Sequence, residues 1–158
     1  MDEVEADLAE IAAMTPHART ILLLSANPLV LSYDKTAPIL EKIREYLPDI
    51  EHVYAAGRVT DLRNKTVEQL RALRDLGLNE ISMGTESGDD WTLERIHKGY
   101  HAADILEQCA KLDEAGIAYG QQDVPGHDAR ALKRTSPVGC STGDVLLESF
   151  SWEADGTG

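Results

Sequence analysis

The feature that most constrains the fold is an alternation of short apolar segments with helix-like segments over the first 119 residues. The apolar segments begin roughly 30 residues apart, which is the spacing of a βαβ unit. They are ILLLS (21–25), HVYAA (52–56), EISMG (80–84) and a segment that starts at IAY (117–119). This alternation predicts an α/β fold with a parallel sheet of about four strands and right-handed crossovers.

The segments between these strands carry apolar residues at helical spacing. One helix is expected before the first strand, and one between each pair of strands. Thr66 and Gln69 form a capping box, and Gly77 and Gly116 stand where helix C-terminal caps belong. The apolar positions are Val4, Leu8 and Ile11, then Ile39, Leu40, Ile43 and Leu47, then Val67, Leu70 and Leu73, and finally Ile105, Leu106, Cys109 and Leu112.

Charge and composition exclude several classes of protein. The net charge is -13, so neither a nucleic acid nor an anionic membrane surface is an expected partner. No segment approaches the ~20 apolar residues that span a bilayer, and the acidic N-terminus is unlike a targeting peptide, so we expect a cytoplasmic protein. The two cysteines, Cys109 and Cys140, are not in a CxxC or CxxxC motif, so no metal site is predicted from this chain alone.

The turns that leave the predicted strands carry the unusual residues. These turns are SANP (25–28), AGRVTD (56–61) and TESGDD (85–90). In parallel α/β folds, ligands bind at the carboxyl ends of the strands. We therefore expect the three turns to converge on one rim of the sheet.

The residues of these turns suit a zwitterionic ligand. The Glu86 carboxylate would oppose a phosphate but suits an amine or a ribose hydroxyl, and Lys98 could pair with a ligand carboxylate. Simpler roles stay open: Asp89 and Asp90 as helix N-caps, Lys98 as a cation at a helix end, and Arg58 as a partner in an ion pair. Catalytic residues cannot be assigned, and GTESG is not the GxSxG motif of serine hydrolases.

Residues 18–119 resemble the central part of radical S-adenosylmethionine (SAM) enzymes. The resemblance is to the Elp3/MiaB/NifB-like and oxygen-independent coproporphyrinogen oxidase-like groups. It is carried by LLLSANPLVLS, by the segment from YAAGRVTD to GTESGDDWTLERIHKGY, and by QCAKLDEAGIAY. It implies a partial (β/α) barrel with SAM across the carboxyl ends of the strands, where Asn27 replaces the family's Glu near the SAM amino group. The predicted cofactor-binding residues are Ser25, Ala26, Asn27, Arg58, Glu86, Ser87 and Lys98.

The sequence also departs from that family. The CxxxCxxC loop that holds a [4Fe-4S] cluster is missing, and the chain begins in what resembles the helix after that loop. Residues 120–158 resemble no part of the family and predict an irregular tail, either frameshifted, fused or disordered, with one short strand within 145–152. We therefore expect residues 1–119 to be a partial barrel from a radical SAM oxidoreductase of unknown substrate, inactive alone.

Two alternatives remain at this point. The chain could be a small complete α/β binding module of flavodoxin-like or nucleotide-binding type, or a non-catalytic scaffold. If it is a partial barrel, its outer strands at 21–25 and 117–119 are unpaired edges, and exposed edges predict self-association.

Overall fold

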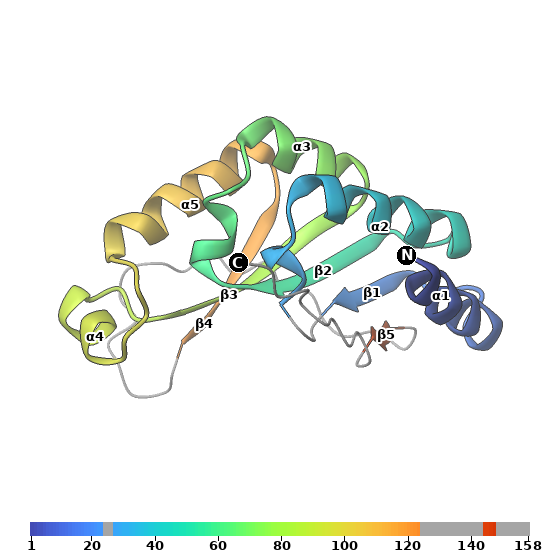
Figure 1. The fold of residues 1–158 in the computed structure, drawn as a ribbon, viewed down its shortest axis with the longest axis horizontal. Helices are drawn as coiled ribbons and strands as arrows, with labels where there is room; N and C mark the ends of the chain where they lie inside the picture. The colour runs from blue at the N-terminus through green and yellow to red at the C-terminus, as the bar shows by residue number, and fades with distance from the viewer. Residues whose placement is uncertain (24–26, 124–143, 148–158) are drawn as a thin grey trace.

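The computed structural model describes residues 1–23, 27–123 and 144–147. Its strands form one five-stranded sheet in the order β4-β3-β2-β1-β5, and every pair of neighbours is parallel. Figure 1 shows β5 beside β1 at one edge and β4 at the other. The strands are β1 (Thr20–Leu23), β2 (His52–Gly57), β3 (Leu78–Glu86), β4 (Ala118–Asp123) and β5 (Asp144–Leu147).

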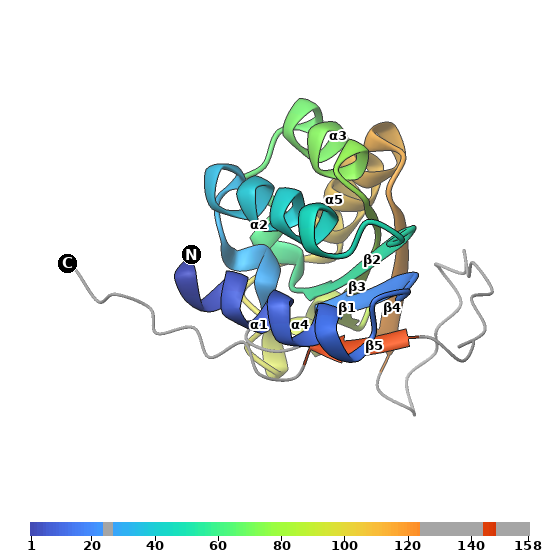
Figure 2. The ribbon, with the colours of Figure 1, turned by 90° about the vertical axis from the view of Figure 1, so that its right-hand side faces the viewer.

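The helices other than α4 form a single layer. Consecutive helices pack on one another, α1 on α2, α2 on α3 and α3 on α5, and Figure 2 shows α2, α3 and α5 on the same side of the strands. None of the helices in the described ranges is long and apolar enough to cross a membrane. They are α1 (Asp2–Met14), α2 (Tyr33–Tyr46), α3 (Val67–Asp75), α4 (Asp90–Arg95) and α5 (Ala102–Ala115), with 3₁₀ turns η1 (Pro28–Val30) and η2 (Val59–Leu62).

The core lies between this helical layer and one face of the sheet. Alternate strand residues point to opposite faces, so one set is buried against the helices and the other set is half-buried. The buried strand residues join the apolar stripes of the helices in one hydrophobic cluster, except that Leu106, which was predicted in the stripe of α5, is exposed. On the strands the cluster contains Ile21, Val53, Ala55, Ile81 and Met83, while Leu22, Tyr54, Glu80 and Ser82 lie on the other face.

The four predicted strands and the helices before and between them are confirmed. Gly116 has φ 75° and ends α5 in the left-handed conformation, as a glycine cap should. β1 ends at Leu23, and positions 24 and 25 of its predicted range lie outside the described residues. β4 runs to Asp123, past the predicted domain boundary, and most of the predicted tail also lies outside the described residues.

One expectation about the sheet edges is wrong. The strand at 21–25 was predicted to be an unpaired edge, but β5 pairs with β1 in register from Thr20 with Asp144 to Leu23 with Leu147. The reason is that the short strand predicted within 145–152 is present at 144–147 and joins the sheet as a further parallel strand beside β1. The opposite edge is as predicted, because β4 has a sheet neighbour on one side only, β3.

Candidate functional site

The connections that leave β1, β2 and β3 meet at the carboxyl ends of the strands. η1 follows β1 and packs on both β2 and η2, and η2 follows β2 and packs on β3. Asn27, Arg58 and Glu86 therefore come to one end of the sheet, because parallel strands all finish at the same edge. Of the predicted site residues, Ser25 and Ala26 lie outside the described residues.

Asn27 and Arg58 are joined through a buried carboxylate. The Asn27 side-chain Nδ2 donates to Asp61 Oδ2 at 2.7 Å, and the Arg58 backbone N–H donates to the same oxygen at 2.7 Å. Asp61 is only 8% exposed. The Asp61 carboxylate thus ties the loop after β1 to the loop after β2.

Asn27 is also strained and incompletely hydrogen-bonded. Its φ is 52°, in the left-handed region that non-glycine residues seldom adopt. Its Oδ1 is buried and has no hydrogen-bond partner in the described part of the chain. The amide cannot be turned around, because that would place Oδ1 against the Asp61 carboxylate. The site therefore holds a free acceptor, which a buried polar atom seldom is.

Glu86 and Lys98 meet directly. Glu86 ends β3 with φ 63°, and Lys98 Nζ lies 2.8 Å from Glu86 Oε1. Both side chains are partly buried, at 26% and 28% exposure. Gly84 lies beside this carboxylate, since a Cβ there would be in ordinary van der Waals contact with Glu86 Oε1, at 3.4 Å. Strained backbone at two predicted site residues is typical of ligand sites.

Tyr100 supports the same end of β3. Its hydroxyl contacts the carbonyl oxygens of Gly84 and Thr85, each at 3.0 Å, and can donate to either of them. Burial and the negative charge of Glu86 raise the Tyr100 pKa, while the positive charge of Arg58 acts in the opposite direction. Arg58, Glu86 and Tyr100 are therefore close enough to interact electrostatically.

Ser87 and the two aspartates after it organise the next turn. The Ser87 hydroxyl accepts a hydrogen bond from the Asp89 N–H at 3.1 Å. Asp89 accepts from the Thr92 N–H at 2.8 Å and is the N-cap of α4, as predicted. Asp90 Oδ1 instead accepts from the Ala102 N–H at 2.7 Å, so it holds the start of α5.

Sequence reasoning did not identify three residues that shape the site: Asp61, Lys65 and Tyr100. Lys65 is 1% exposed, and its ammonium is surrounded by oxygens of both 3₁₀ turns. Lys65 directly precedes Thr66, the N-cap of α3, and a charged residue at such a position is usually exposed, so the sequence contains no sign of its burial. Signals were present for Asp61, which lies inside the turn AGRVTD, and for Tyr100, which ends the segment GTESGDDWTLERIHKGY.

The described residues do not gather a metal site. No group of three or more His, Cys, Asp or Glu side chains within these ranges could hold a metal ion. Cys109 is a buried residue of α5 inside the hydrophobic core, and Cys140 lies outside the described ranges.

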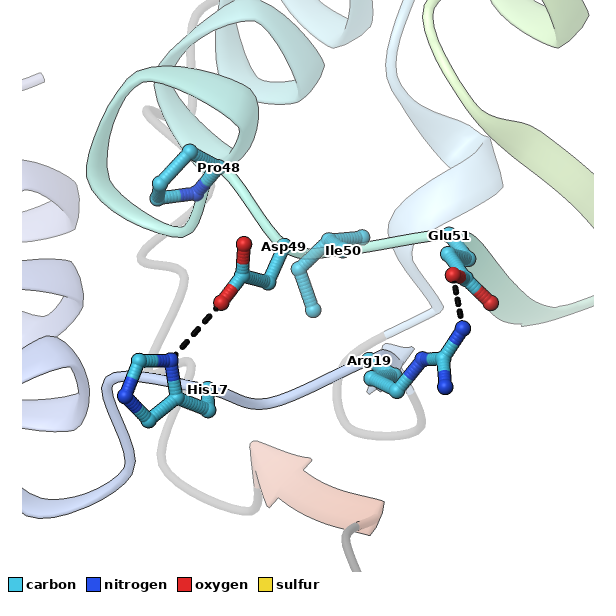
Figure 3. A pocket seen from close by; sticks show the side chains of 6 residues that line it. All are labelled: His17, Arg19, Pro48, Asp49, Ile50 and Glu51. Carbon is cyan, nitrogen blue, oxygen red and sulfur yellow. Dashed lines mark hydrogen bonds and ion pairs between the residues drawn. The ribbon is translucent and has the colours of Figure 1, made fainter.

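A shallow pocket lies at the opposite end of the sheet, before β1 and β2 (Figure 3). It is lined by His17, Arg19, Pro48, Asp49, Ile50 and Glu51. His17 Nδ1 lies 2.8 Å from Asp49 Oδ2, and Arg19 forms an ion pair with Glu51. The charged side chains pair with one another and are largely exposed, so this pocket is separate from the candidate site.

Comparisons with known proteins agree with this architecture. A family model described as the radical SAM superfamily matches residues 1–123. The heme chaperone HemW of Bacillus subtilis (strain 168) is 22% identical over 144 residues, which are 85% of this chain and 37% of that protein. The chain thus spans little more than a third of that curated relative.

Solved structures that resemble it include those of OxsB, described as a cobalamin-dependent S-adenosylmethionine radical enzyme. The form with aqua-cobalamin and SAM bound matches with a TM-score of 0.60 and 18% identity, over 78% of this chain and 19% of that one. The apo form matches with a TM-score of 0.58 and 16% identity, again over 78% and 19%. Because the family model covers most of the residues, the chain belongs to the radical SAM superfamily.

Proposed function

We propose that residues 1–123 form the SAM-binding segment of a radical SAM oxidoreductase, and that the amino-acid end of SAM binds at the carboxyl ends of β1 to β3. The observation that carries this proposal is the Glu86–Lys98 pair of 2.8 Å at the end of β3. It places an anion and a cation side by side where parallel α/β sheets bind ligands. A ligand that carries both an ammonium and a carboxylate can pair its ammonium with Glu86 and its carboxylate with Lys98.

The residues present fit the methionine part of SAM. Its ammonium has three N–H donors, and the site offers the Glu86 carboxylate and the unpartnered Oδ1 of Asn27 as acceptors. Its carboxylate has cations available in Lys98 and in Arg58, whose charge reaches the Tyr100–Glu86 region. When bound, SAM would supply the 5′-deoxyadenosyl group for hydrogen abstraction.

The same residues do not fit a [4Fe-4S] cluster. The sequence has two cysteines, and the one that the structure describes is buried in the core. The ligands would have to come from cysteines outside these 158 residues. The role that we propose for the described residues is to bind and orient SAM, and we assign them no step of hydrogen abstraction.

The topology counts against a flavodoxin-like or nucleotide-binding module. Such doubly wound sheets reverse their strand order at a switch point and carry helices on both faces. Within residues 1–123, β1 to β4 follow one another in order and α2, α3 and α5 lie on one side of the strands; among the described strands, only the added β5 lies beyond β1. That singly wound arrangement is the one expected for part of a (β/α) barrel.

The test is a titration of the full chain with SAM, followed by NMR chemical shifts of its amides. We expect a dissociation constant in the millimolar range, about -4 kcal/mol. Lys98→Met and Glu86→Gln should each weaken SAM binding about tenfold, equivalent to ~1.4 kcal/mol. Lys42→Met is the matched control, because Lys42 also lies 2.9 Å from a Glu5 oxygen at a similar exposure, on the distant helix α2.

A second ligand sharpens the test. 5′-Methylthioadenosine keeps the adenosine but lacks the ammonium and the carboxylate. The two site variants should bind it as the wild type does. Equal SAM affinity in Lys98→Met and wild type, or equal losses for both ligands, would contradict the proposed placement of the amino-acid end.

A further inference from the structure

Lys65 is a buried cation with an unusual set of partners. It is 1% exposed and ranks among the largest fully buried side chains of the described residues. Its Nζ donates to the carbonyl oxygens of Leu29 and Leu31, each at 2.7 Å. The Asp61 carbonyl oxygen and Asn64 Oδ1 lie at 3.2 Å. An ammonium has three N–H groups and accepts nothing, so these four oxygens use its whole donor capacity.

These contacts join the two turns that carry the candidate site. Leu29 belongs to η1 and Leu31 follows it, whereas Asp61 belongs to η2. The carbonyl oxygens at the end of a helical turn lack partners within the turn, and they carry partial negative charge. Lys65 therefore binds the end of η1 and fixes it to η2.

A carboxylate holds the other end of the same turn. Asn27 is the N-cap of η1, and its Nδ2 donates to Asp61 Oδ2. η1 is thus held at its start by the Asp61 carboxylate and at its end by the Lys65 ammonium. Between them, the buried Leu29 side chain packs on Gly57, where an added Cβ would lie 2.6 Å from Leu29 Cδ1.

An apolar side chain in the place of Lys65 would have a smaller desolvation cost. Removing an ammonium from water is costly, and burial lowers the pKa of Lys65 even though the charge of Asp61 opposes this. An apolar replacement would leave the Leu29 and Leu31 carbonyls without this donor. Burying the Lys65 ammonium therefore costs free energy, but it holds η1 in place through the Leu29 and Leu31 carbonyls.

We propose that Lys65 is a positioning residue for the candidate cofactor site: its ammonium sets η1 against η2, and so aims the free amide oxygen of Asn27 at the ammonium of SAM. The role of SAM in this statement rests on the proposed function. Lys65 itself is not proposed to touch the ligand, since its Nζ is already surrounded by protein oxygens.

The chain contains a matched control in Lys111. Its Nζ donates to the Leu62 carbonyl oxygen at 2.7 Å and to Gln108 Oε1 at 3.0 Å. Burial lowers its pKa as well. Lys111 is therefore a partly buried ammonium that binds η2 and α5, and none of its hydrogen bonds reaches η1.

The experiment compares Lys65→Met with Lys111→Met in the full chain, by three measurements. Thermal unfolding reports stability, the NMR signal of the Asn27 side-chain amide without ligand reports its position, and titrations report the affinities for SAM and 5′-methylthioadenosine. Both variants should unfold at lower temperature. Only Lys65→Met should shift the Asn27 amide signal and weaken SAM binding, by about tenfold, with methylthioadenosine binding unchanged.

Chemical rescue separates positioning from general destabilisation. In Lys65→Ala, added propylammonium can place an ammonium in the vacated space. This addition should recover the Asn27 signal and most of the SAM affinity. Tetramethylammonium has no N–H donor and should recover neither. Unchanged Asn27 signals in Lys65→Met, or equal losses of SAM affinity in Lys65→Met and Lys111→Met, would overturn the proposal. If the wild type fails to bind SAM, the proposed function fails, while the ligand-free Asn27 signal still decides the positioning role.

Discussion

In the ligand-free chain, Lys98 Nζ lies 2.8 Å from Glu86 Oε1, so the two charges expected to bind opposite ends of a zwitterion neutralise each other. A ligand that carries both charges can replace each residue's partner at once. A ligand with a single charge would leave either the partly buried carboxylate or the partly buried ammonium uncompensated, which is unfavourable. The pair therefore favours zwitterions over simple amines or acids.

This relationship predicts a measurable coupling. In a double-mutant cycle of Glu86→Gln and Lys98→Met, the interaction free energy in the absence of ligand should be about 1 kcal/mol, the upper range for pairs that are partly exposed. Urea denaturation of the four chains measures it. The same cycle for Glu5 and Lys42, an ion pair of similar exposure between α1 and α2, serves as a comparison away from the site, and both interaction free energies should decrease in 1 M salt, where charges are screened.

Tyr100→Phe should loosen the end of β3. The variant loses the hydroxyl that contacts the Gly84 and Thr85 carbonyls, and should be destabilised by about 1 kcal/mol. Because these carbonyls immediately precede Glu86, SAM affinity should fall too. Denaturation and SAM titration of the same sample provide the check; full SAM affinity in a destabilised Tyr100→Phe chain would show that the hydroxyl only stabilises the fold.

Gly57→Ala should displace η1. The added methyl group would lie 2.6 Å from Leu29 Cδ1, closer than carbon atoms approach, so Leu29 or the β2 terminus must move. Overpacking of this kind costs about 1–3 kcal/mol. Gly88→Ala is the control, since a Cβ there meets nothing within 4 Å. Comparable stability of the two variants would contradict the close packing of Leu29 on Gly57.

Stability should decrease at alkaline pH through Tyr119. Burial, together with the neighbouring Cys109 and Asp113, raises the Tyr119 pKa to about 12 from its ordinary value of 10.0. Between these values the unfolded chain has lost a proton that the folded chain keeps, so the free energy of unfolding falls as pH rises from about 10 to about 12. Tyrosinate absorbance should show a late-titrating group that Tyr119→Phe removes, and that variant should lose less stability over this interval.

Removing β5 should promote self-association. The described sheet has open edges at β4 and β5, and a chain ending at residue 143 would move the second open edge to β1. β5 carries the charged Asp144, which disfavours edge-to-edge pairing, whereas β1 (TILL) has no charged residue. The charge of -13 opposes association, but in ~0.15 M salt its reach is only about 8 Å. Light scattering at several concentrations should show larger species for the truncated chain than for the full chain. A monomeric truncated chain would mean that β5 does not protect this edge.

The sequence determined the fold class and the general location of the site, because both follow from local patterns. The short apolar run at 52–56 and the helical spacing at 67–73 reflect strand and helix geometry, whatever the rest of the chain does. Parallel strands joined by helices then bring Asn27, Arg58 and Glu86 to one edge. The capping roles of Thr66 and Asp89 could also be read from neighbouring residues.

Only the tertiary structure decided which groups meet. Nothing local indicates that Asp61 accepts from Asn27, 34 positions earlier, or that Lys65 leaves solvent to bind the Leu29 carbonyl, 36 positions earlier. The pairing of β5 with β1 likewise joins segments more than a hundred residues apart. Whether a charge is buried, and whether an edge strand is added, depends on which distant segments pack beside it. A local sequence pattern does not contain this information.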